Sequence, residues 1–275
     1  MTGGRLVVCP TPIGNLEDVT LRVLAALRDA DLVACEDTRR TRVLLERYGV
    51  QASLVSYHEH NESSRAAELV ERMLDGDVVA LVSDAGMPLV SDPGYVLVQG
   101  CVAAGLEVEV LPGPSAALAA LVASALPAEA WRFAGFLPRK RGALAEVLGS
   151  PETVVAFESP RRVGASLAVL AELDPSRPVA VCRELTKLHE EVVRGTAAEL
   201  AARFAEGARG EITVVVGSGE LLAEQPAADA PSLDDRIRAL LAGGETPRDV
   251  ARTLARELNL SRREVYARVQ VLVGA

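Results

Sequence analysis

Five polar turns, most of them rich in glycine or proline, hold the side chains of this sequence that are best suited to chemistry. Each turn follows a short aliphatic run that is typical of a buried strand. The turns are residues 10–15, 83–88, 111–116, 157–162 and 183–187. Because open α/β sheets bind ligands at the carboxyl ends of their strands, we predict that these five turns line one ligand site.

The sequence lacks the motifs of several common enzyme classes. It has no GxxxxGK[ST] loop and no GxGxxG after the first aliphatic run, so the usual phosphate and dinucleotide cradles are missing. It also has no GxSxG nucleophile elbow and no HExxH motif. His58 and His60 flank a glutamate, but these three residues do not complete a tetrahedral ligand set. We therefore expect no metal site.

The composition is that of a folded protein that does not enter a membrane. Of the 275 residues, 49% are hydrophobic and 24% are charged, and the net charge is −9. The longest nearly apolar stretch, 115–126, is too short to span a bilayer, and the apolar run after Arg5 is too short for a secretory signal. Four widely spaced cysteines in apolar segments are typical of buried, reduced thiols. We expect a cytoplasmic protein with no membrane partner.

Strands and helices alternate along the body of the chain. Most of the aliphatic runs show no polar alternation, as expected for strands that helices cover on both faces. Alternating strands and helices predict an open, mostly parallel sheet. The predicted strands are 5–9, 32–35, 53–56, 78–82, 107–111, 132–136, 153–157, 179–183, 190–194 and 212–217.

Capping signals predict the ends of several helices. Asp92 and Ser159, each followed by proline, have the pattern of an N-cap and a first helical residue. Thr196 opens a capping box. Apolar residues recur at helical spacing over 66–74, and Gly76 follows where that helix should end.

Two changes in composition predict the domain organisation. Prolines on both sides of Gly113 favour a boundary there, and a stretch rich in alanine and proline without periodicity is typical of a linker. We predict α/β domains at 1–112 and 113–219, a linker at 220–231 and a helical module at 232–275.

The helical module has the pattern of three short helices, two of which form a helix-turn-helix. It carries eight arginines and six acidic residues, a net charge of +2, whereas the rest of the chain has −11. The polar residues predicted on the outer side of its last helix are Arg262, Arg263, Arg268 and Gln270. This pattern is compatible with nucleic-acid contact and equally with docking on a protein.

Three clusters of basic residues stand out in the acidic body. They are Arg39 with Arg40 and Arg42, residues 139–141, and Arg161 with Arg162. Each cluster alone is compatible with a solvated loop or helix start as well as with a phosphate contact. The acidic total argues against indiscriminate binding to nucleic-acid backbones, but local clusters leave RNA open as a substrate.

Taken together, these segments resemble the tetrapyrrole-methylase superfamily of S-adenosylmethionine-dependent enzymes, and within it the ribosomal RNA small subunit methyltransferase I family. The superfamily usually has GxGxGD and GGDP where this chain has PTPIGN and SDAG, and Met87 stands where the family more often has threonine. The segments that carry the resemblance are VCPTPIGNLEDVTLR (8–22), ACEDTRRT (34–41), SYHEHNE (56–62), LVSDAGMPLVSDPG (81–94), LPGPSAALAAL (111–121), FAGFLPRKR (133–141), AFESPRR (156–162), CRELTK (182–187) and GEITVVV (210–216).

The resemblance implies an α/β fold: two α/β domains of tetrapyrrole-methylase type with the cofactor cleft between them, followed by the small helix-turn-helix-like module. The implied cofactor, S-adenosylmethionine, has no phosphate and needs apolar walls, backbone hydrogen bonds and a group that tolerates its sulfonium. The residues implied to contact it are Pro12, Ile13, Ser83, Asp84, Met87, Ser115, Ala116, Phe157 and Leu185.

The resemblance also implies methylation of the ribose 2′-oxygen of a cytidine (position 1402, in the decoding region) of 16S ribosomal RNA, in the assembled small subunit and by a homodimer. This reaction needs a base for the hydroxyl proton and groups that hold phosphates or stabilise the alkoxide. We hypothesise that the base comes from turn 36–39 or turn 157–162. The candidate bases are Glu36, Asp37, Glu158, Glu184 and His60, and the candidate cations are Arg39, Arg161 and Lys187.

Two other functions remain open at this point. One is methylation of a corrin or porphyrin ring, against which stand the basic turns and the helical module. The other is a DNA-binding regulator that uses residues 232–275, against which stands the modest charge of that segment. We expect no DNA partner.

Overall fold

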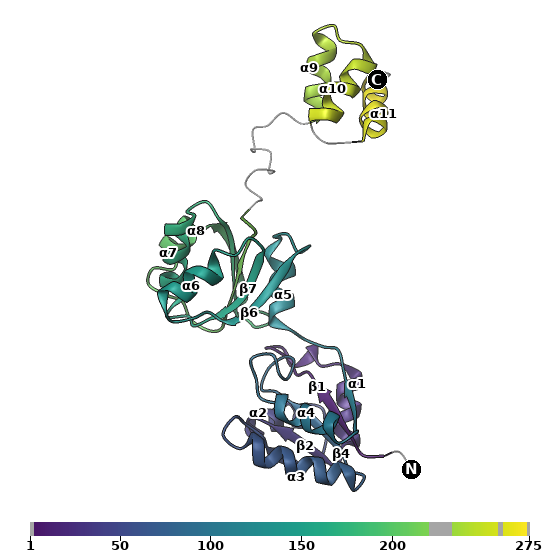
Figure 1. Cartoon of the computed structure of the whole chain (residues 1–275), viewed down its shortest axis with the longest axis vertical. Coiled ribbons are helices and arrows are strands. Elements are labelled where there is room, and N and C mark those ends of the chain that lie inside the picture. The colour runs from purple at the N-terminus through teal and green to yellow at the C-terminus, as the bar shows by residue number, and fades with distance from the viewer. Residues whose placement is uncertain (1–2, 220–232, 258–260, 274–275) are drawn as a thin grey trace. The chain divides into compact units, whose positions relative to one another are not determined.

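A computed structural model describes residues 3–219, 233–257 and 261–273. The chain divides into two compact units, Met1–Leu222 and Ala223–Ala275 (Figure 1). The first unit contains two five-stranded sheets, and the described part of the second is helical. The predicted linker at 220–231 lies outside the described residues, and the domain boundaries at 112 and 219 stay predictions.

The first sheet is entirely parallel, with strand order β3-β2-β4-β1-β5. Side chains of β1 alternate between its two faces: Leu6 and Val8 pack with helices α3 and α4, whereas Val7 and Cys9 pack with α1 and α2. Both faces are therefore buried, which explains why the strand sequences lack polar alternation. The strands are β1 (Arg5–Cys9), β2 (Leu32–Cys35), β3 (Leu54–Ser56), β4 (Val78–Val82) and β5 (Glu107–Val110), and the helices are α1 (Leu21–Asp29), α2 (Thr38–Arg47), α3 (Glu62–Leu74) and α4 (Tyr95–Ala103), with a short 3₁₀ helix η1 (Leu16–Asp18).

The second sheet is mixed, with strand order β6-β7-β10-β8-β9. Only β6 and β7 pair in parallel, so the prediction of a mostly parallel sheet is wrong for this half. The physical reason is that β8 and β9 are joined by a short turn, which only antiparallel strands allow. The strands are β6 (Trp131–Phe136), β7 (Thr153–Glu158), β8 (Pro178–Arg183), β9 (Glu191–Thr196) and β10 (Ile212–Val216).

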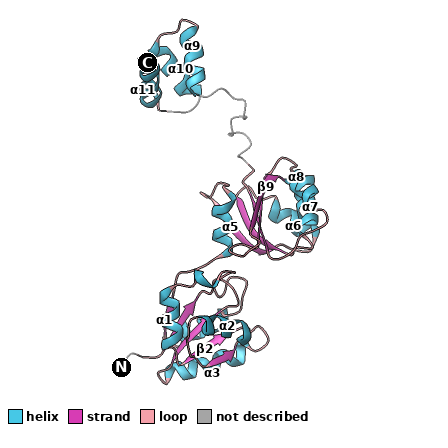
Figure 2. Ribbon diagram, turned by 180° about the vertical axis from the view of Figure 1, so that it is seen from behind, coloured by secondary structure: helices cyan, strands magenta, loops and turns pink. Residues whose placement is uncertain are grey.

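Helices also cover both faces of the second sheet. Helix α5 lies on one face and α6, α7 and α8 lie on the other (Figure 2). Ile13, from the turn after β1, joins the core under α5 and so packs the two sheets' ends together. The helices are α5 (Ala116–Ser124), α6 (Arg141–Leu148), α7 (Val163–Leu173) and α8 (Ala197–Arg203).

Strands β7 and β8 end at the same edge of the second sheet, although they are not neighbours. Both run antiparallel to β10, and Ile212 at the start of β10 pairs with Glu158 and with Arg183. Turns 157–162 and 183–187 therefore flank the amino end of β10. This arrangement brings a third segment, just before β10, to the edge where the two turns lie.

Two helices begin later than their capping signals predict. Helix α4 starts at Tyr95 with Gly94 as its N-cap, because left-handed residues at Leu89 and Ser91 fold the preceding segment into a loop. Helix α7 starts at Val163, since the chain first turns over Ser159, whose carbonyl accepts from the Arg162 backbone N–H. Asp92 and Ser159 are therefore loop residues rather than N-caps. The capping box at Thr196 is confirmed.

The second unit contains helices α9 (Leu233–Ala242), α10 (Pro247–Glu257) and α11 (Arg262–Val273), packed around a core of its own. The four polar residues predicted on the outer side of the last helix are all exposed: Arg262, Arg263, Arg268 and Gln270. Arg268 Nε also donates to Asp234 Oδ1 of α9 at 2.7 Å, which ties its guanidinium to its own unit.

The described residues bear out one further expectation from the composition. All four cysteines are buried and free. Within the described ranges, no helix has the length and apolar character that a bilayer span requires.

Candidate active site

A cavity of about 430 Å³ lies within the first unit, and all five polar turns contribute residues to its wall. The turn residues among its lining are Ile13, Asp84, Ala85, Gly86, Met87, Ser115, Ala116, Phe157, Glu158, Ser159, Pro160 and Leu185. Glu36, at the end of β2, also lines it. Turns of both sheets line the cavity, which is the arrangement expected when the strand ends of the two sheets face one another.

Apolar groups make up much of the wall. Ile13 and Leu185 belong to the buried cluster under α5, and Met87 belongs to the core beside α4. The Phe157 ring makes edge-to-face contacts with Phe133 at 5.0 Å and Phe136 at 5.5 Å between ring centroids. These contacts hold the aromatic wall in one orientation.

Ser83 and Pro12 are not among the lining residues, but the turns that contain them support the cavity. Ser83 Oγ donates to the Gly86 carbonyl at 3.0 Å, and Thr11 Oγ1 donates to the Ser83 carbonyl at 3.0 Å. Thr11 and Gly86 also form an antiparallel bridge. Gly86 has φ +83°, a backbone conformation that residues with a side chain rarely adopt, and a Cβ there would contact Ile13 Cγ2 at 3.4 Å. Glycine therefore suits this position, where two site turns touch.

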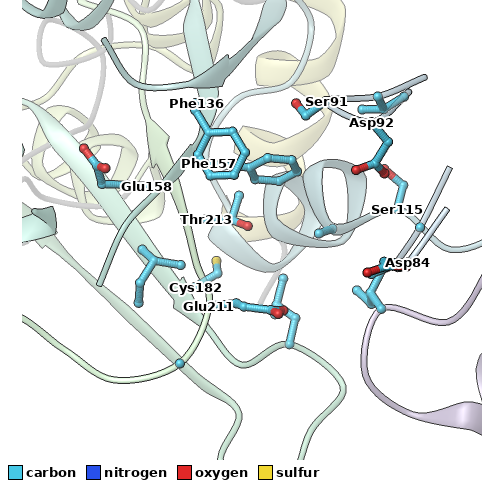
Figure 3. Close-up of a pocket in the computed structure, with 18 of the residues that line it drawn as sticks. Asp84, Ser91, Asp92, Ser115, Phe136, Phe157, Glu158, Cys182, Glu211 and Thr213 are labelled. Atoms are coloured by element: carbon cyan, nitrogen blue, oxygen red, sulfur yellow. The ribbon is translucent and has the colours of Figure 1, made fainter. Parts of the chain in front are cut away.

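Three carboxyl groups, from Glu36, Asp84 and Asp92, line the side of the cavity that belongs to the first sheet (Figure 3 labels the two aspartates). Asp84 Oδ1 accepts from the Asp37 backbone N–H at 3.0 Å, and Asp84 Oδ2 lies 3.4 Å from Arg40 Nη1. Burial, followed by the negative charge of Asp84, raises the pKa of Glu36. Burial and the charges of Glu36 and Asp84 raise the pKa of Asp92 to about 6.

Glu158 lines the cavity, but both of its carboxylate oxygens are already engaged. Oε1 accepts from the Ser159 backbone N–H at 2.6 Å and lies 3.3 Å from Arg162 Nη1, and Oε2 accepts from Ser166 Oγ. Its side chain is 1% exposed. In Figure 3 the carboxylate lies beyond the Phe136 and Phe157 rings from the two labelled aspartates. These bonds fasten β7 to α7.

Asp37, Arg39 and Lys187 lie outside the cavity wall. Asp37 is the N-cap of α2 and pairs with Arg39, whose hydrogen bonds lower the pKa of Asp37 to about 2. Lys187 Nζ donates to Glu184 Oε1 and to Glu211 Oε2, both at 2.9 Å. The lysine therefore ties turn 183–187 to the segment before β10.

The structure adds lining residues that the sequence analysis did not select: Arg40, Val90, Ser91, Asp92, Phe136, Cys182 and residues 210–213. Asp92 was interpreted as a helix cap, and the left-handed backbone before it gave no signal in the sequence. Residues 210–213 lie at the amino end of an antiparallel strand. The sequence analysis considered only the turns at the carboxyl ends of strands and therefore missed them. In the part of the chain that the structure describes, no group of three or more His, Cys, Asp or Glu side chains could hold a metal ion.

Comparison with known proteins shows the family to which this chain belongs. The pattern of the Tetrapyrrole (Corrin/Porphyrin) Methylases matches residues 5–201. The chain is 50% identical over 229 residues to a ribosomal RNA small subunit methyltransferase I from Mesorhizobium japonicum, covering 81% of this chain and 78% of that protein. It is 40% identical over 271 residues to the protein of the same name from Halalkalibacterium halodurans, covering 96% and 93% of the two chains.

The chain belongs to the ribosomal RNA small subunit methyltransferase I family. The wider fold is confirmed by the solved structure of uroporphyrin-III C-methyltransferase from Thermus thermophilus complexed with S-adenosyl homocysteine. That structure is 21% identical, has a TM-score of 0.56, and aligns with 80% of this chain and 99% of its own. The α/β body with two sheets is therefore the tetrapyrrole-methylase fold, and this chain carries in addition the helical second unit of α9, α10 and α11.

Proposed function

We propose that this protein uses S-adenosylmethionine to methylate the ribose 2′-oxygen of a cytidine in 16S ribosomal RNA of the small subunit. The observation that carries the proposal is the cavity between the two sheets, which has apolar walls, an acidic side and no phosphate cradle. It occurs in a chain that is 40–50% identical to ribosomal RNA small subunit methyltransferase I proteins.

The residues of the cavity fit this cofactor. Ile13, Met87 and Leu185 offer the apolar surface that an adenosyl group needs. Ser115 is the N-cap of α5, and the first backbone N–H groups of a helix suit a carboxylate such as that of the methionine head. Asp84 with its neighbouring carboxyl groups suits a positively charged sulfonium.

When bound, the cofactor supplies an electrophilic methyl group. The side chains must hold the 2′-oxygen in line with that group and accept the hydroxyl proton as the new bond forms. Glu36 and Asp92 are the cavity carboxyl groups whose pKa values are raised toward neutrality. We assign the proton to this pair, because Asp37 and Glu158 are engaged in structural bonds.

The same proposal includes the assembled subunit as substrate and a homodimer as the working enzyme. Two apolar side chains on one face of α5 support self-association: Leu118 is 52% and Val122 is 81% exposed. Sedimentation of the purified protein would measure this, and a monomer at micromolar concentration would contradict it.

Methylation of a corrin or porphyrin is the second candidate. It is favoured by the family pattern and by the uroporphyrin-III methyltransferase fold, which this chain shares. Transfer of a labelled methyl group to tetrapyrroles, and not to small ribosomal subunits, would select it.

The decisive experiment is a map of ribose methylation at nucleotide resolution in 16S ribosomal RNA from cells with and without this protein. We expect one cytidine of the decoding region to lose its 2′-O-methyl group when the protein is absent, and purified protein with S-adenosylmethionine to restore it on isolated subunits. An unchanged map would contradict the proposal.

A further inference from the structure

Three loops of the second sheet adjoin where they meet the wall of the cavity. Arg162 Nη2, after β7, donates to the Pro138 carbonyl, after β6, at 2.8 Å. The Ala208 backbone N–H, before β10, donates to the Pro160 carbonyl at 2.8 Å. Phe136, Pro160 and Gly210 from these loops all line the cavity.

The same three loops carry most of the unpaired positive charge of the first unit. Within residues 3–219, only six Arg or Lys side chains make no hydrogen bond or ion pair, and all six are exposed. They are Arg28, Arg42, Arg139, Lys140, Arg161 and Arg209. Four of the six stand on these loops. Their neighbours Arg141 and Arg162 differ, because they pair with Glu172 and Glu158.

An exposed aromatic ring accompanies these cations. Phe136 is 65% exposed although it lines the cavity, and its ring is held edge-to-face against Phe157. Figure 3 shows the two rings next to each other. Basic side chains around a presented aromatic ring are the usual means of holding single-stranded nucleic acid, because phosphates meet cations and bases stack on rings.

We propose that Phe136, Arg139, Lys140, Arg161 and Arg209 form a basic rim that binds the RNA strand on either side of the target nucleotide. The inference rests on the proposed function. The 2′-oxygen is attached next to the carbon that carries the 3′-phosphate, so a ribose that enters the cavity leaves its flanking phosphates at the mouth. The arginines bind these phosphates, and Phe136 stacks on a base that is splayed from its helix.

The rim is not neutralised by the acidic residues around it. Glu206 is exposed on the loop before β10, whereas Glu211 is bound to Lys187 and Glu158 is buried. Four unpaired cations therefore stand on loops whose one exposed, unpaired carboxylate is Glu206. An acidic protein needs such a local patch to approach RNA, since its overall charge of −9 repels the backbone.

Charge-neutral variants of the full-length protein test the rim. Arg139→Gln with Arg161→Gln, and Arg209→Gln alone, are compared with Arg28→Gln, which removes an exposed, unpaired arginine of α1. Binding to small subunits is measured over a range of salt concentrations. We expect the double variant to bind about tenfold more weakly, and its salt dependence (log K against log salt) to fall by about 0.7 per lost phosphate contact. Arg28→Gln should match the parent protein.

Two further readouts separate the rim from the cofactor site. Calorimetry with S-adenosylhomocysteine should give the same affinity for all these variants, because none of the substituted arginines lines the cavity. Phe136→Leu should weaken binding to subunits. Phe136→Trp should bind subunits as the parent protein does, because tryptophan still stacks on a base.

Different results overturn different claims. If the parent protein methylates subunits and the rim variants behave like Arg28→Gln, the rim is wrong and the proposed function stands. If the parent protein neither binds S-adenosylhomocysteine nor methylates subunits, the proposed function is wrong. If the rim variants lose affinity for subunits but not for isolated RNA that contains the target loop, the rim contacts a ribosomal protein and the inference is overturned.

Discussion

At the scale of single residues, the carboxyl groups of the site divide into those engaged in structural bonds and those that lie in the cavity with a raised pKa. Asp37 and Glu158 are bound by backbone N–H groups and arginines. Glu36 and Asp92 line the cavity, where burial raises their pKa values. Two groups of the same chemical type therefore have different roles, which their surroundings determine.

Asp92→Asn should stabilise the protein at neutral pH. The pKa of Asp92 is about 6 in the folded chain, above the ordinary value of 3.8, so the native state binds the proton more tightly. The free energy of unfolding should therefore fall as pH rises from about 4 to 6, and the variant should avoid this loss. We expect a gain of about 1–2 kcal/mol at pH 7 and a smaller one at pH 4.5, measured by urea unfolding. A less stable variant at pH 7 would contradict the argument.

The raised pKa values of Glu36 and Asp92 also predict how the rate of methyl transfer depends on pH. Single-turnover rates should fall below about pH 6, where Asp92 takes up a proton. Glu36→Gln and Asp92→Asn should each lower the rate by about 100-fold at pH 7.5, as loss of a general base does. Asp37→Asn is the matched control, and it should retain its rate within about twofold because that carboxylate caps α2 outside the cavity.

Glu158→Ala should act on folding more than on chemistry. The substitution leaves the buried Ser166 Oγ and the half-buried Arg162 without their carboxylate partner. We expect the free energy of unfolding to fall by about 3 kcal/mol, since breaking a buried pair on one side is costly. Unfolding by urea measures it, and an unchanged midpoint together with a lost single-turnover rate would instead make Glu158 part of the chemistry.

At the scale of elements, the site depends on turns that pack against one another. A Cβ on Gly113 would lie 2.4 Å from Pro10 Cγ, so the turns after β5 and β1 meet without room for another atom. Asn15 and Thr186 link a turn of each sheet, because the Asn15 backbone N–H donates to Thr186 Oγ1 at 3.0 Å. These contacts set the distance between the two walls of the cavity.

Gly113→Ala should therefore push the turns after β1 and β5 apart and so change the shape of the cavity. We expect the affinity for S-adenosylhomocysteine to fall by about tenfold, and the free energy of unfolding to fall by about 2 kcal/mol, as overpacking does. Gly142→Ala, in α6, is the control: a Cβ there has no atom within 4 Å, and alanine favours a helix. That variant should be equally or more stable, and calorimetry should give the parent affinity. Parent affinity in both variants would show that the Pro10 contact does not shape the site.

At the scale of the whole molecule, the two units have separate cores. The buried residues of the second unit, among them Ile237, Val250 and Val269, form one cluster that includes no residue of the first. Every described residue that lines the cavity belongs to the first unit. We therefore propose that the first unit binds the cofactor and that the second has another task.

Removal of residues 223–275 should separate these tasks. We expect the remaining unit to fold and to bind S-adenosylhomocysteine as the full chain does, because it retains both sheets and every lining residue. We propose that the second unit docks on the substrate, so the KM of the shortened chain for small subunits should rise by about tenfold. Equal activity on assembled subunits would contradict the docking role.

Much of the fold and of the site was predictable because it depends on local patterns. Ten aliphatic runs predicted ten strands, and five turns at their ends predicted the wall of the cavity. The direction of β10 was not predictable in this way. Aliphatic side chains suit parallel and antiparallel neighbours alike, and pairing is decided by connections that lie far apart in the chain.

What the sequence alone determined is therefore the set of buried strands, the turns that follow them and the family to which they belong. The tertiary structure decided which polar groups are available for chemistry. Glu158 and Asp92 look alike in sequence, each beside a proline-containing turn. Ser166 and Arg162 of the neighbouring helix and turn engage the first, whereas the left-handed backbone before α4 brings the second to the cavity. The availability of a carboxylate depends on the groups that surround it in space: the partners of Glu158 lie within eight residues of it, whereas Asp92 lies near Glu36 from a different strand end.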